Sequence, residues 1–247
     1  MHIKPIISLP VSRRTASGGR ESALLTVKHP PRREIAQLTA LYNSVVDLVY
    51  EEGLLVMRGQ IASRLERDPG SIFAAYLDGR LVGMINVVKL HLSTLAMMPT
   101  DHQSLTGDDS WETTDPRNAN VWICPWVATH PEQGRGWKGE FADQPLSLGQ
   151  LLVQSVAVKA SLNRLPIEHV IAYSRPAGLR AYFGESIQPL SVINYIGTRT
   201  NEGRILDPVI RFHVENGARL IRDLIFPYGH TGDQNSLFYR TCLGYRL

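Results

Sequence analysis

The stretch Val-Ala-Thr-His-Pro-Glu-Gln-Gly-Arg-Gly, residues 127–136, decides the fold class of this chain. It ends an apolar run, residues 120–129, that predicts a buried β-strand, and a helical pattern begins at residue 148. Glycines let backbone N–H groups approach a phosphate closely, and a helix N-terminus adds unpaired donors and the positive end of a dipole. The order strand, glycine-bearing loop and helix therefore predicts a diphosphate cradle, with a plain surface turn as the competing interpretation.

The sequence on either side of this loop predicts alternating helices and strands. Residues 32–50 have helical apolar spacing, and residues 53–68 predict a second, shorter helix. Two β-rich runs, residues 71–77 and 81–90, are joined by Asp-Gly, which is a strong hairpin signal. A long polar segment, residues 93–120, has the composition of a functional or disordered loop.

The C-terminal half predicts a mixture of short elements and one well-marked helix. The expected elements are a helix from 148 to about 160, a strand at 170–173, a partly helical segment at 177–201, and a closing strand pair at 218–224 and 237–243. Asp207-Pro208 predicts a capped helix start, and Gly217 predicts its end. On that helix lies His213, whose imidazole can give or take a proton near neutral pH, although a lone helical histidine also fits a structural role.

Bulk composition is that of an ordinary globular protein. The chain has 247 residues, 43% of them hydrophobic and 20% charged, with a net charge of +3. Only two cysteines, Cys124 and Cys242, are present, which excludes a disulfide scaffold and favours a reducing, cytoplasmic location. No apolar run reaches about 18 residues, so no membrane span is expected. The histidines lack metal-ligand spacing, so no metal is expected. We expect a flexible arm at residues 1–22 and a single domain at 23–247.

Residues 127–136 resemble the acyl-CoA loop of the GNAT (GCN5-related N-acetyltransferase) superfamily. The resemblance implies an α/β (α+β) fold, with a mixed central sheet flanked by helices and a parallel strand pair that splays apart to admit a pantetheine arm. It also implies a set of donor-binding residues: Val127, Thr129, Gln133, Gly134, Arg135, Gly136 and Gly149. In GNAT enzymes a tyrosine that protonates the departing thiolate usually lies four residues before the glycine that ends the last helix. His213 has that spacing from Gly217.

A narrower resemblance covers about residues 71–239. Five segments are similar to the GNAT-like domains of polyketide loading modules and related stand-alone proteins: residues 98–100, 105–108, 114–116, 173–175 and 207–218. In those relatives a histidine and a threonine are implicated in decarboxylating malonyl-CoA and passing acetyl to a carrier thiol. His213 matches the histidine, and Ser174 is the candidate for the threonine. The arginine expected after the final tyrosine is missing, because Tyr228 is followed by Gly229 and His230.

Together these features predict a GNAT-type acyltransferase. It would move an acyl group from CoA, a carrier protein or a similar donor to an amine or thiol of a small-molecule acceptor, in natural-product biosynthesis. No tightly bound cofactor is expected, with acyl-CoA as cosubstrate. An insertion at residues 138–148 separates the loop from its helix and leaves room for a carrier protein or an aminoacyl-tRNA as donor. Malonyl-CoA decarboxylation with S-acyl transfer, and a non-catalytic binding module, remain alternatives. Oligomeric state is not evident.

Overall fold

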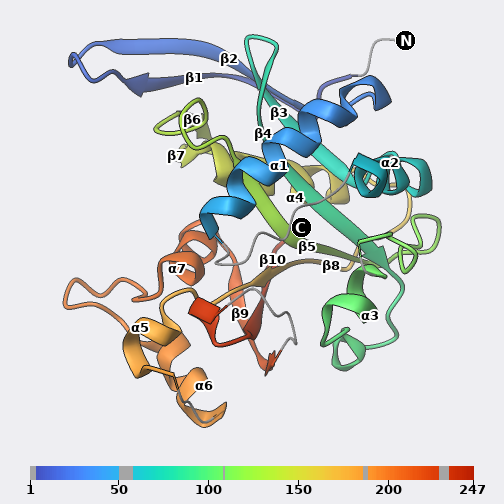
Figure 1. Ribbon diagram of the computed structural model, residues 1–247, viewed down its shortest axis with the longest axis vertical. Coiled ribbons are helices and arrows are strands. Elements are labelled where there is room, and N and C mark those ends of the chain that lie inside the picture. The colour runs from blue at the N-terminus through green and yellow to red at the C-terminus, as the bar shows by residue number, and fades with distance from the viewer. Residues whose placement is uncertain (1–3, 50–57, 108, 186–188, 228–233) are drawn as a thin grey trace.

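A computed structural model describes residues 4–49, 58–107, 109–185, 189–227 and 234–247 (Figure 1). Among these residues, the centre is one ten-stranded mixed sheet in the order β7-β6-β1-β2-β3-β4-β5-β8-β10-β9. The strands are β1 (Ile7–Arg14), β2 (Arg20–Lys28), β3 (Ile72–Leu77), β4 (Arg80–Leu90), β5 (Val121–Thr129), β6 (Lys138–Phe141), β7 (Gln144–Ser147), β8 (His169–Ser174), β9 (Arg219–Pro227) and β10 (Tyr239–Tyr245).

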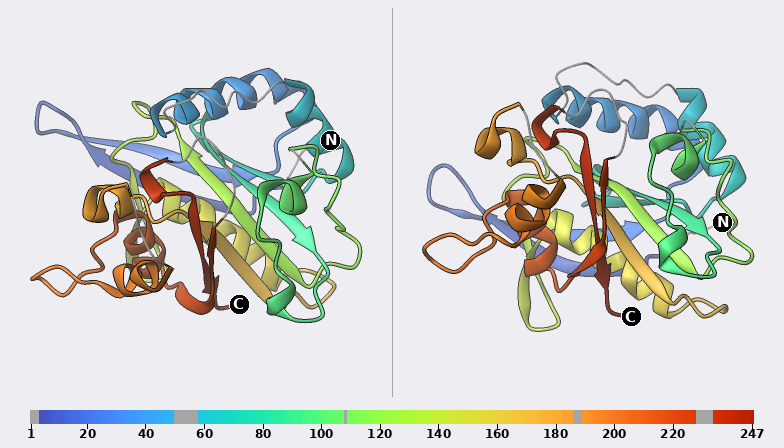
Figure 2. Two further views of the ribbon diagram at one scale, coloured as in Figure 1. Left: turned by 60° about the horizontal axis from the view of Figure 1, so that its bottom comes forward. Right: turned by 90° about the horizontal axis from the view of Figure 1, so that it is seen from below.

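Helices cover both faces of the sheet. They are α1 (Ile35–Val49), α2 (Arg58–Arg67), α3 (His102–Thr106), α4 (Leu148–Ser161), α5 (Leu179–Phe183), α6 (Pro189–Gly197) and α7 (Pro208–Glu215). Helices α1 and α2 lie on one face, and α4 lies on the other (Figure 2). Each face has its own core: Leu38 and Met84 belong to the core under α1 and α2, whereas Ile85 and Leu152 belong to the core under α4. Neighbouring residues of β4 therefore point to opposite faces, as the pleat requires.

Most expected elements are present within a few residues of their expected bounds. The β3–β4 hairpin turns at Asp78 and Gly79, both with positive φ (46° and 84°), as a type I′ turn requires. The partly helical segment contains α5 and α6, and the closing pair is β9 with β10. Strand β10 inserts between β8 and β9, an order that the local sequence pattern does not encode.

A parallel pair that splays apart is present at the centre of the sheet. Strand β5 pairs in parallel with β8 from Val121↔His169 to Cys124↔Ala172, and the pairing stops there. Beyond that point β5 continues to Thr129 bonded only to β4. The opening begins at Pro125, whose ring nitrogen has no hydrogen to donate to a neighbouring strand. The fold is thus the one expected of a GNAT protein.

The expected flexible N-terminal arm is wrong for the residues that the structure describes. Residues 7–14 and 20–28 form the antiparallel hairpin β1–β2, which extends the main sheet. The Ser-Gly-Gly sequence that suggested mobility is part of the hairpin turn, where Gly18 has φ of 82°. Alternate residues such as Val11 bury their side chains, so the segment has a structured role.

The insertion at 138–148 also extends the sheet. It forms the hairpin β6–β7, and β6 pairs with β1 through Val11↔Gly139. A Cβ on Gly139 would lie 2.5 Å from Leu9 Cδ1, so a larger residue at this position would make the Leu9 side chain move. The described residues of the long segment 93–120 contain α3, and Trp111 Nε1 donates to Val87 O at 3.1 Å. None of the helices described is both long and apolar enough to cross a bilayer.

Candidate active site

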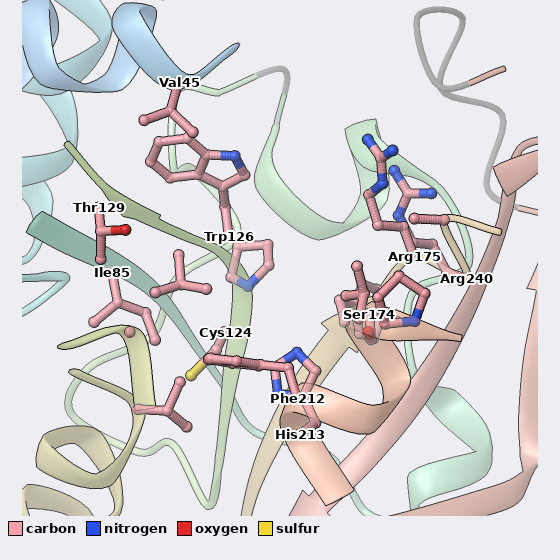
Figure 3. A pocket seen from close by; sticks show the side chains of 18 residues that line it. Val45, Ile85, Cys124, Trp126, Thr129, Ser174, Arg175, Phe212, His213 and Arg240 are labelled. Atoms are coloured by element: carbon pink, nitrogen blue, oxygen red, sulfur yellow. The ribbon is translucent and has the colours of Figure 1, made fainter. Parts of the chain in front are cut away.

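A cavity of about 420 Å³ opens where β5 and β8 separate (Figure 3). Its walls come from both splayed strands, from α4, from α7 and from β10, with Val45 of α1 at its upper edge. Trp126 lines it and stacks on Tyr42 of α1, with ring centroids 3.9 Å apart. Most of the lining is apolar, so the few polar side chains that reach it define its chemistry.

The open edge of β5 offers backbone groups to a ligand. His130, which follows β5, donates its backbone N–H to Val82 O of β4 at 2.7 Å. The pairing of β5 with β4 is continuous from Trp126 to Thr129. Backbone groups alternate in direction along a strand, so those of Val127 and Thr129 point away from β4, towards the splay. Both residues, which the sequence predicted to bind the donor, line the cavity. A pantetheine arm needs such unpaired amide partners.

Ser174 ends β8 at the cavity. Its side chain is buried, and its Oγ has no hydrogen-bond partner among the described residues. A buried unpaired hydroxyl is costly, so an unpaired one facing a cavity is available to a ligand. Arg175, which follows it, and Arg240 of β10 also line the cavity, and Figure 3 shows both guanidinium groups on the Ser174 side. The arginine expected from the loading-domain pattern belonged near Tyr228, which lies outside the described residues. The guanidinium groups of Arg175 and Arg240 therefore bring positive charge to the cavity from two other positions.

Helix α7 is fixed at its start by Asp207, which is fully buried. Its Oδ1 accepts from the backbone N–H groups of Val209 and Ile210, at 2.9 and 3.0 Å, which is the expected N-cap. Its Oδ2 accepts from Gly178 N–H at 2.8 Å and from the Tyr195 hydroxyl at 3.0 Å. The carboxylate thus ties the segment that follows Ser174 to the helix that carries the candidate histidine.

His213 lies on α7 with its ring in the cavity wall, in edge contact with Phe212. Its Nδ1 lies 2.7 Å from the hydroxyl of Tyr245 on β10. Burial lowers the pKa of His213 to about 4, because the imidazolium ion would lose its hydration. His213 is therefore neutral at pH 7. A neutral imidazole is a hydrogen-bond donor and acceptor, whereas a charged one would be a ready proton donor.

Cys124, which also lines the cavity, is not a nucleophile in this state. Burial raises the pKa of its thiol to about 12. A thiol must lose its proton to attack, and desolvation opposes that loss. Cys124 is therefore an inert buried residue of the cavity wall.

The loop at 130–136 has already used several of its backbone donors. The N–H groups of Glu132 and Gln133 donate to His130 Nδ1, at 3.3 and 3.2 Å, and Gly134 N–H donates to His130 O at 2.9 Å. A Cβ on Gly134 would lie 2.9–3.1 Å from backbone atoms of His130 and Val82, so glycine is required. The loop is therefore a closed turn that leaves the N–H groups of Arg135 and Gly136 as its remaining donors.

The structure brings together five of the nine predicted site residues around one cavity. These are His213, Ser174, Val127, Thr129 and Gly149, the last packed against Phe212. Gln133, Gly134, Arg135 and Gly136 lie outside the cavity lining, on the turn after β5. Sequence reasoning missed Arg240 and Tyr245, because each lies in the last strand and reaches the site only through the sheet order.

The fold and site together define a protein of the GNAT fold, the class to which acyl-CoA-dependent acyltransferases belong. A family model described as the malonyl-CoA decarboxylase C-terminal domain matches residues 155–235, a third of the chain. No curated protein matches the chain significantly by sequence.

Solved structures with this fold include loading and decarboxylase domains. The loading GNAT-like domain of CurA from Lyngbya majuscula superimposes with a TM-score of 0.66 at 22% identity, covering 90% of this chain and 96% of that one. The GphF GNAT-like decarboxylase in complex with isobutyryl-CoA gives 0.66 at 19% identity, covering 89% and 97%. A ribosomal-protein-alanine N-acetyltransferase from Brucella melitensis gives 0.50 at 15% identity, covering 90% and 99%. At these identities the likeness establishes the fold alone.

Proposed function

We propose that this protein is a GNAT-type acyltransferase that takes an acyl group from a CoA or carrier-protein thioester. The observation that carries this proposal is the cavity at the β5–β8 splay, where unpaired backbone groups of Val127 and Thr129 meet the side chains of Ser174 and His213. The pantetheine arm would bond to the open edge of β5, and the thioester carbonyl would lie near His213. The CoA-bound state of one structural relative supports a thioester as ligand.

The transfer step needs an amine or thiol acceptor in the same cavity. The acceptor attacks the thioester carbonyl, the carbon–sulfur bond breaks, and the proton lost by the acceptor passes to the departing thiolate. Positioning two substrates in one cavity supplies much of the rate. Ser174 Oγ and the His213 ring are the polar groups that would bind the carbonyl oxygen as charge develops on it.

A second candidate function is decarboxylation of a malonyl-type thioester before acyl transfer. Two observations favour it: the match of residues 155–235 to the malonyl-CoA decarboxylase domain, and the presence of Arg175 and Arg240 in the cavity wall. A carboxylate entering a desolvated site needs a matched cation, and guanidinium groups provide one. The bond between the α-carbon and the carboxylate breaks and CO₂ leaves, the electron pair remains on the thioester as an enolate, and the α-carbon takes a proton from water, which leaves hydroxide.

An aminoacyl-tRNA donor has less support. Arg13, a basic residue near the N-terminus that could have contacted a nucleic acid, bonds to Glu21 at 2.7 Å and lies 4.8 Å from the Trp137 ring centroid. These contacts link the two strands of the β1–β2 hairpin and hold it against Trp137, which explains Arg13 without a nucleic acid.

One assay distinguishes these functions. The protein is incubated with acetyl-CoA, malonyl-CoA, their carrier-protein equivalents and aminoacyl-tRNA, each with amine and thiol acceptors. Intact mass spectrometry identifies the acylated product, and released CO₂ is measured in parallel. Acyl transfer from acetyl thioesters without CO₂ supports the first function, and CO₂ release from malonyl thioesters supports the second. No reaction with any thioester would contradict both.

The arginines give a sharper test of the second function. Replacing Arg240 or Arg175 with methionine keeps much of the side-chain length and removes the cation. If a guanidinium binds the malonyl carboxylate, the KM for malonyl thioesters should rise at least tenfold, while that for acetyl thioesters should change little. Arg211→Met, on the α7 helix, is the control. Equal losses on both donors would contradict carboxylate recognition.

A further inference from the structure

A chain of hydrogen bonds connects α4 to the buried edge of the His213 ring. Gln154 Nε2 donates to the backbone oxygen of Asn216 at 3.0 Å and to its side-chain Oδ1 at 3.1 Å. Asn216 Nδ2 donates to Gln150 O at 3.3 Å, and the same side chain bonds to the hydroxyl of Tyr245. That hydroxyl lies 2.7 Å from His213 Nδ1. The chain spans α4, the C-terminus of α7 and β10.

Two backbone carbonyls determine which side-chain atom donates in each hydrogen bond of this network. A backbone carbonyl can only accept, so the atom of Gln154 that bonds to Asn216 O is the amide nitrogen, and Asn216 presents its oxygen to it. The amide nitrogen of Asn216 is fixed independently, because its partner Gln150 O is also a carbonyl. The side chain of Asn216 therefore has its oxygen occupied and its N–H groups available for Tyr245.

The hydroxyl of Tyr245 consequently accepts from Asn216 and has one proton of its own to donate. Burial raises the pKa of Tyr245, and the bond from Asn216 opposes that rise, as a donor to the phenol oxygen does. The phenol keeps its proton at neutral pH. The nearest acceptor for that proton is His213 Nδ1. A ring nitrogen that accepts at Nδ1 in a neutral imidazole carries its own proton on Nε2.

We propose that Tyr245 and Asn216 are positioning residues that hold neutral His213 with its proton on Nε2, aimed into the cavity as a hydrogen-bond donor. This inference rests on the proposed function only for the role of His213 towards a thioester. A ring in this state cannot take a proton at Nε2. It donates a hydrogen bond to the carbonyl oxygen as negative charge develops, which is electrostatic stabilisation by a neutral group.

The titratable groups around the His213 ring are compatible with a neutral imidazole. They are Cys124 from β5, Tyr173 and Arg175 at the end of β8, and Arg240 and Tyr245 from β10. No carboxylate is among these groups to favour the imidazolium ion, and burial lowers the pKa of His213 to about 4. The ring therefore stays neutral across the physiological range.

The test is nitrogen NMR of the ligand-free protein labelled with ¹⁵N-histidine. His213 is assigned by the signals lost in His213→Gln. At pH 7 the inference predicts a protonated, pyrrole-type Nε2 and an unprotonated, pyridine-type Nδ1, with no protonation until the pH approaches 4. A proton on Nδ1, or a charged ring at pH 7, would overturn the inference. Since no substrate is present, this result is independent of the proposed function.

Two variants test the roles of the positioning residues. Tyr245→Phe keeps the ring and removes the donor, so the two tautomers of His213 should become mixed, and kcat should fall about tenfold with little change in KM. Tyr239→Phe, on the same strand and outside the cavity, is the matched control. Asn216→Asp replaces the N–H donor with an acceptor for the Tyr245 proton, so the His213 proton should move to Nδ1. Thermal unfolding first establishes that each variant folds.

The outcomes separate this inference from the proposed function. An Nε2 proton in the wild-type protein without turnover of any thioester would keep the inference and contradict the function. Turnover with an Nδ1 proton would keep the function and contradict the inference. An unchanged tautomer in both Tyr245→Phe and Asn216→Asp would show that neither residue positions the ring.

Discussion

At the scale of single residues, His213 is the proposed catalytic residue, and its environment determines what chemistry its ring can perform. The ring is almost fully buried and bonded to a buried phenol, so it is neutral where a surface histidine would be partly charged. Its spacing from Gly217 suggested a proton donor to the leaving group. The structure favours a hydrogen-bond donor to the carbonyl oxygen instead, because the cost of burying the charged form is not offset by a carboxylate partner.

Replacing His213 tests that role. His213→Gln should lower kcat by about 10²–10³-fold, since removal of one oxyanion donor has this effect in other acyl-transfer enzymes. The KM of the donor should change little, because the bond strengthens only as charge develops. Steady-state kinetics measures both. His91→Gln, on an exposed loop, is the control, and a variant that raised KM alone would contradict the role.

At the scale of elements, α7 depends on one buried carboxylate for its position. Asp207→Ala removes two N-cap bonds and leaves the Tyr195 hydroxyl and the Gly178 amide without their acceptor. Loss of the cap costs about 0.5–2 kcal/mol, and each of the two buried unpaired donors costs about 1–3 kcal/mol, so the free energy of unfolding should fall by at least about 2.5 kcal/mol. Urea unfolding measures this. The control is Ser147→Ala at the N-cap of α4, where the cap side chain holds no donor from another segment, so its loss should cost about 1 kcal/mol. Equal losses of stability in Asp207→Ala and Ser147→Ala would contradict this role of Asp207.

The loop after β5 is the subject of a second prediction at the level of elements. Gly134→Ala places a Cβ about 3 Å from backbone atoms, so the turn must shift. Because this turn holds the end of β5, the KM for the CoA donor should rise at least threefold, with a loss of stability of about 1–3 kcal/mol. Gly59→Ala has open space around its Cβ and is the control. Calorimetric titration with CoA measures the affinity, and an unchanged affinity would show that the turn does not contribute to donor binding.

At the scale of the whole molecule, the buried histidine couples stability to pH. Its folded pKa of about 4 lies below the unfolded value of about 6.5, so the unfolded chain binds the extra proton first. Stability should therefore fall as the pH falls from about 6.5 to 4, by up to about 3 kcal/mol from this group. Urea unfolding across this range, compared with His213→Gln, measures the difference. The variant should lose less stability on acidification, and parallel curves would contradict the assignment.

The sequence predicted the class of fold, and five of the nine residues that it suggested for the site line the candidate cavity. Local signals, such as the Asp78-Gly79 turn and the Asp207 cap, depend on neighbouring residues and were correctly interpreted. The order of strands depends on contacts between distant segments, so Tyr245 and Arg240 could not be placed beside His213 in advance. The arm at 1–22 was misjudged because its glycines mark a hairpin turn as readily as a disordered end.

We propose that an acyl thioester lies in the β5–β8 splay with its carbonyl at His213. A crystal structure of the protein with a non-hydrolysable acyl-CoA analogue is the decisive test. Backbone bonds from Val127 or Thr129 to the pantetheine arm are expected, with the carbonyl oxygen within hydrogen-bond distance of His213 Nε2. An analogue bound elsewhere, or one whose carbonyl lies away from His213, would contradict it.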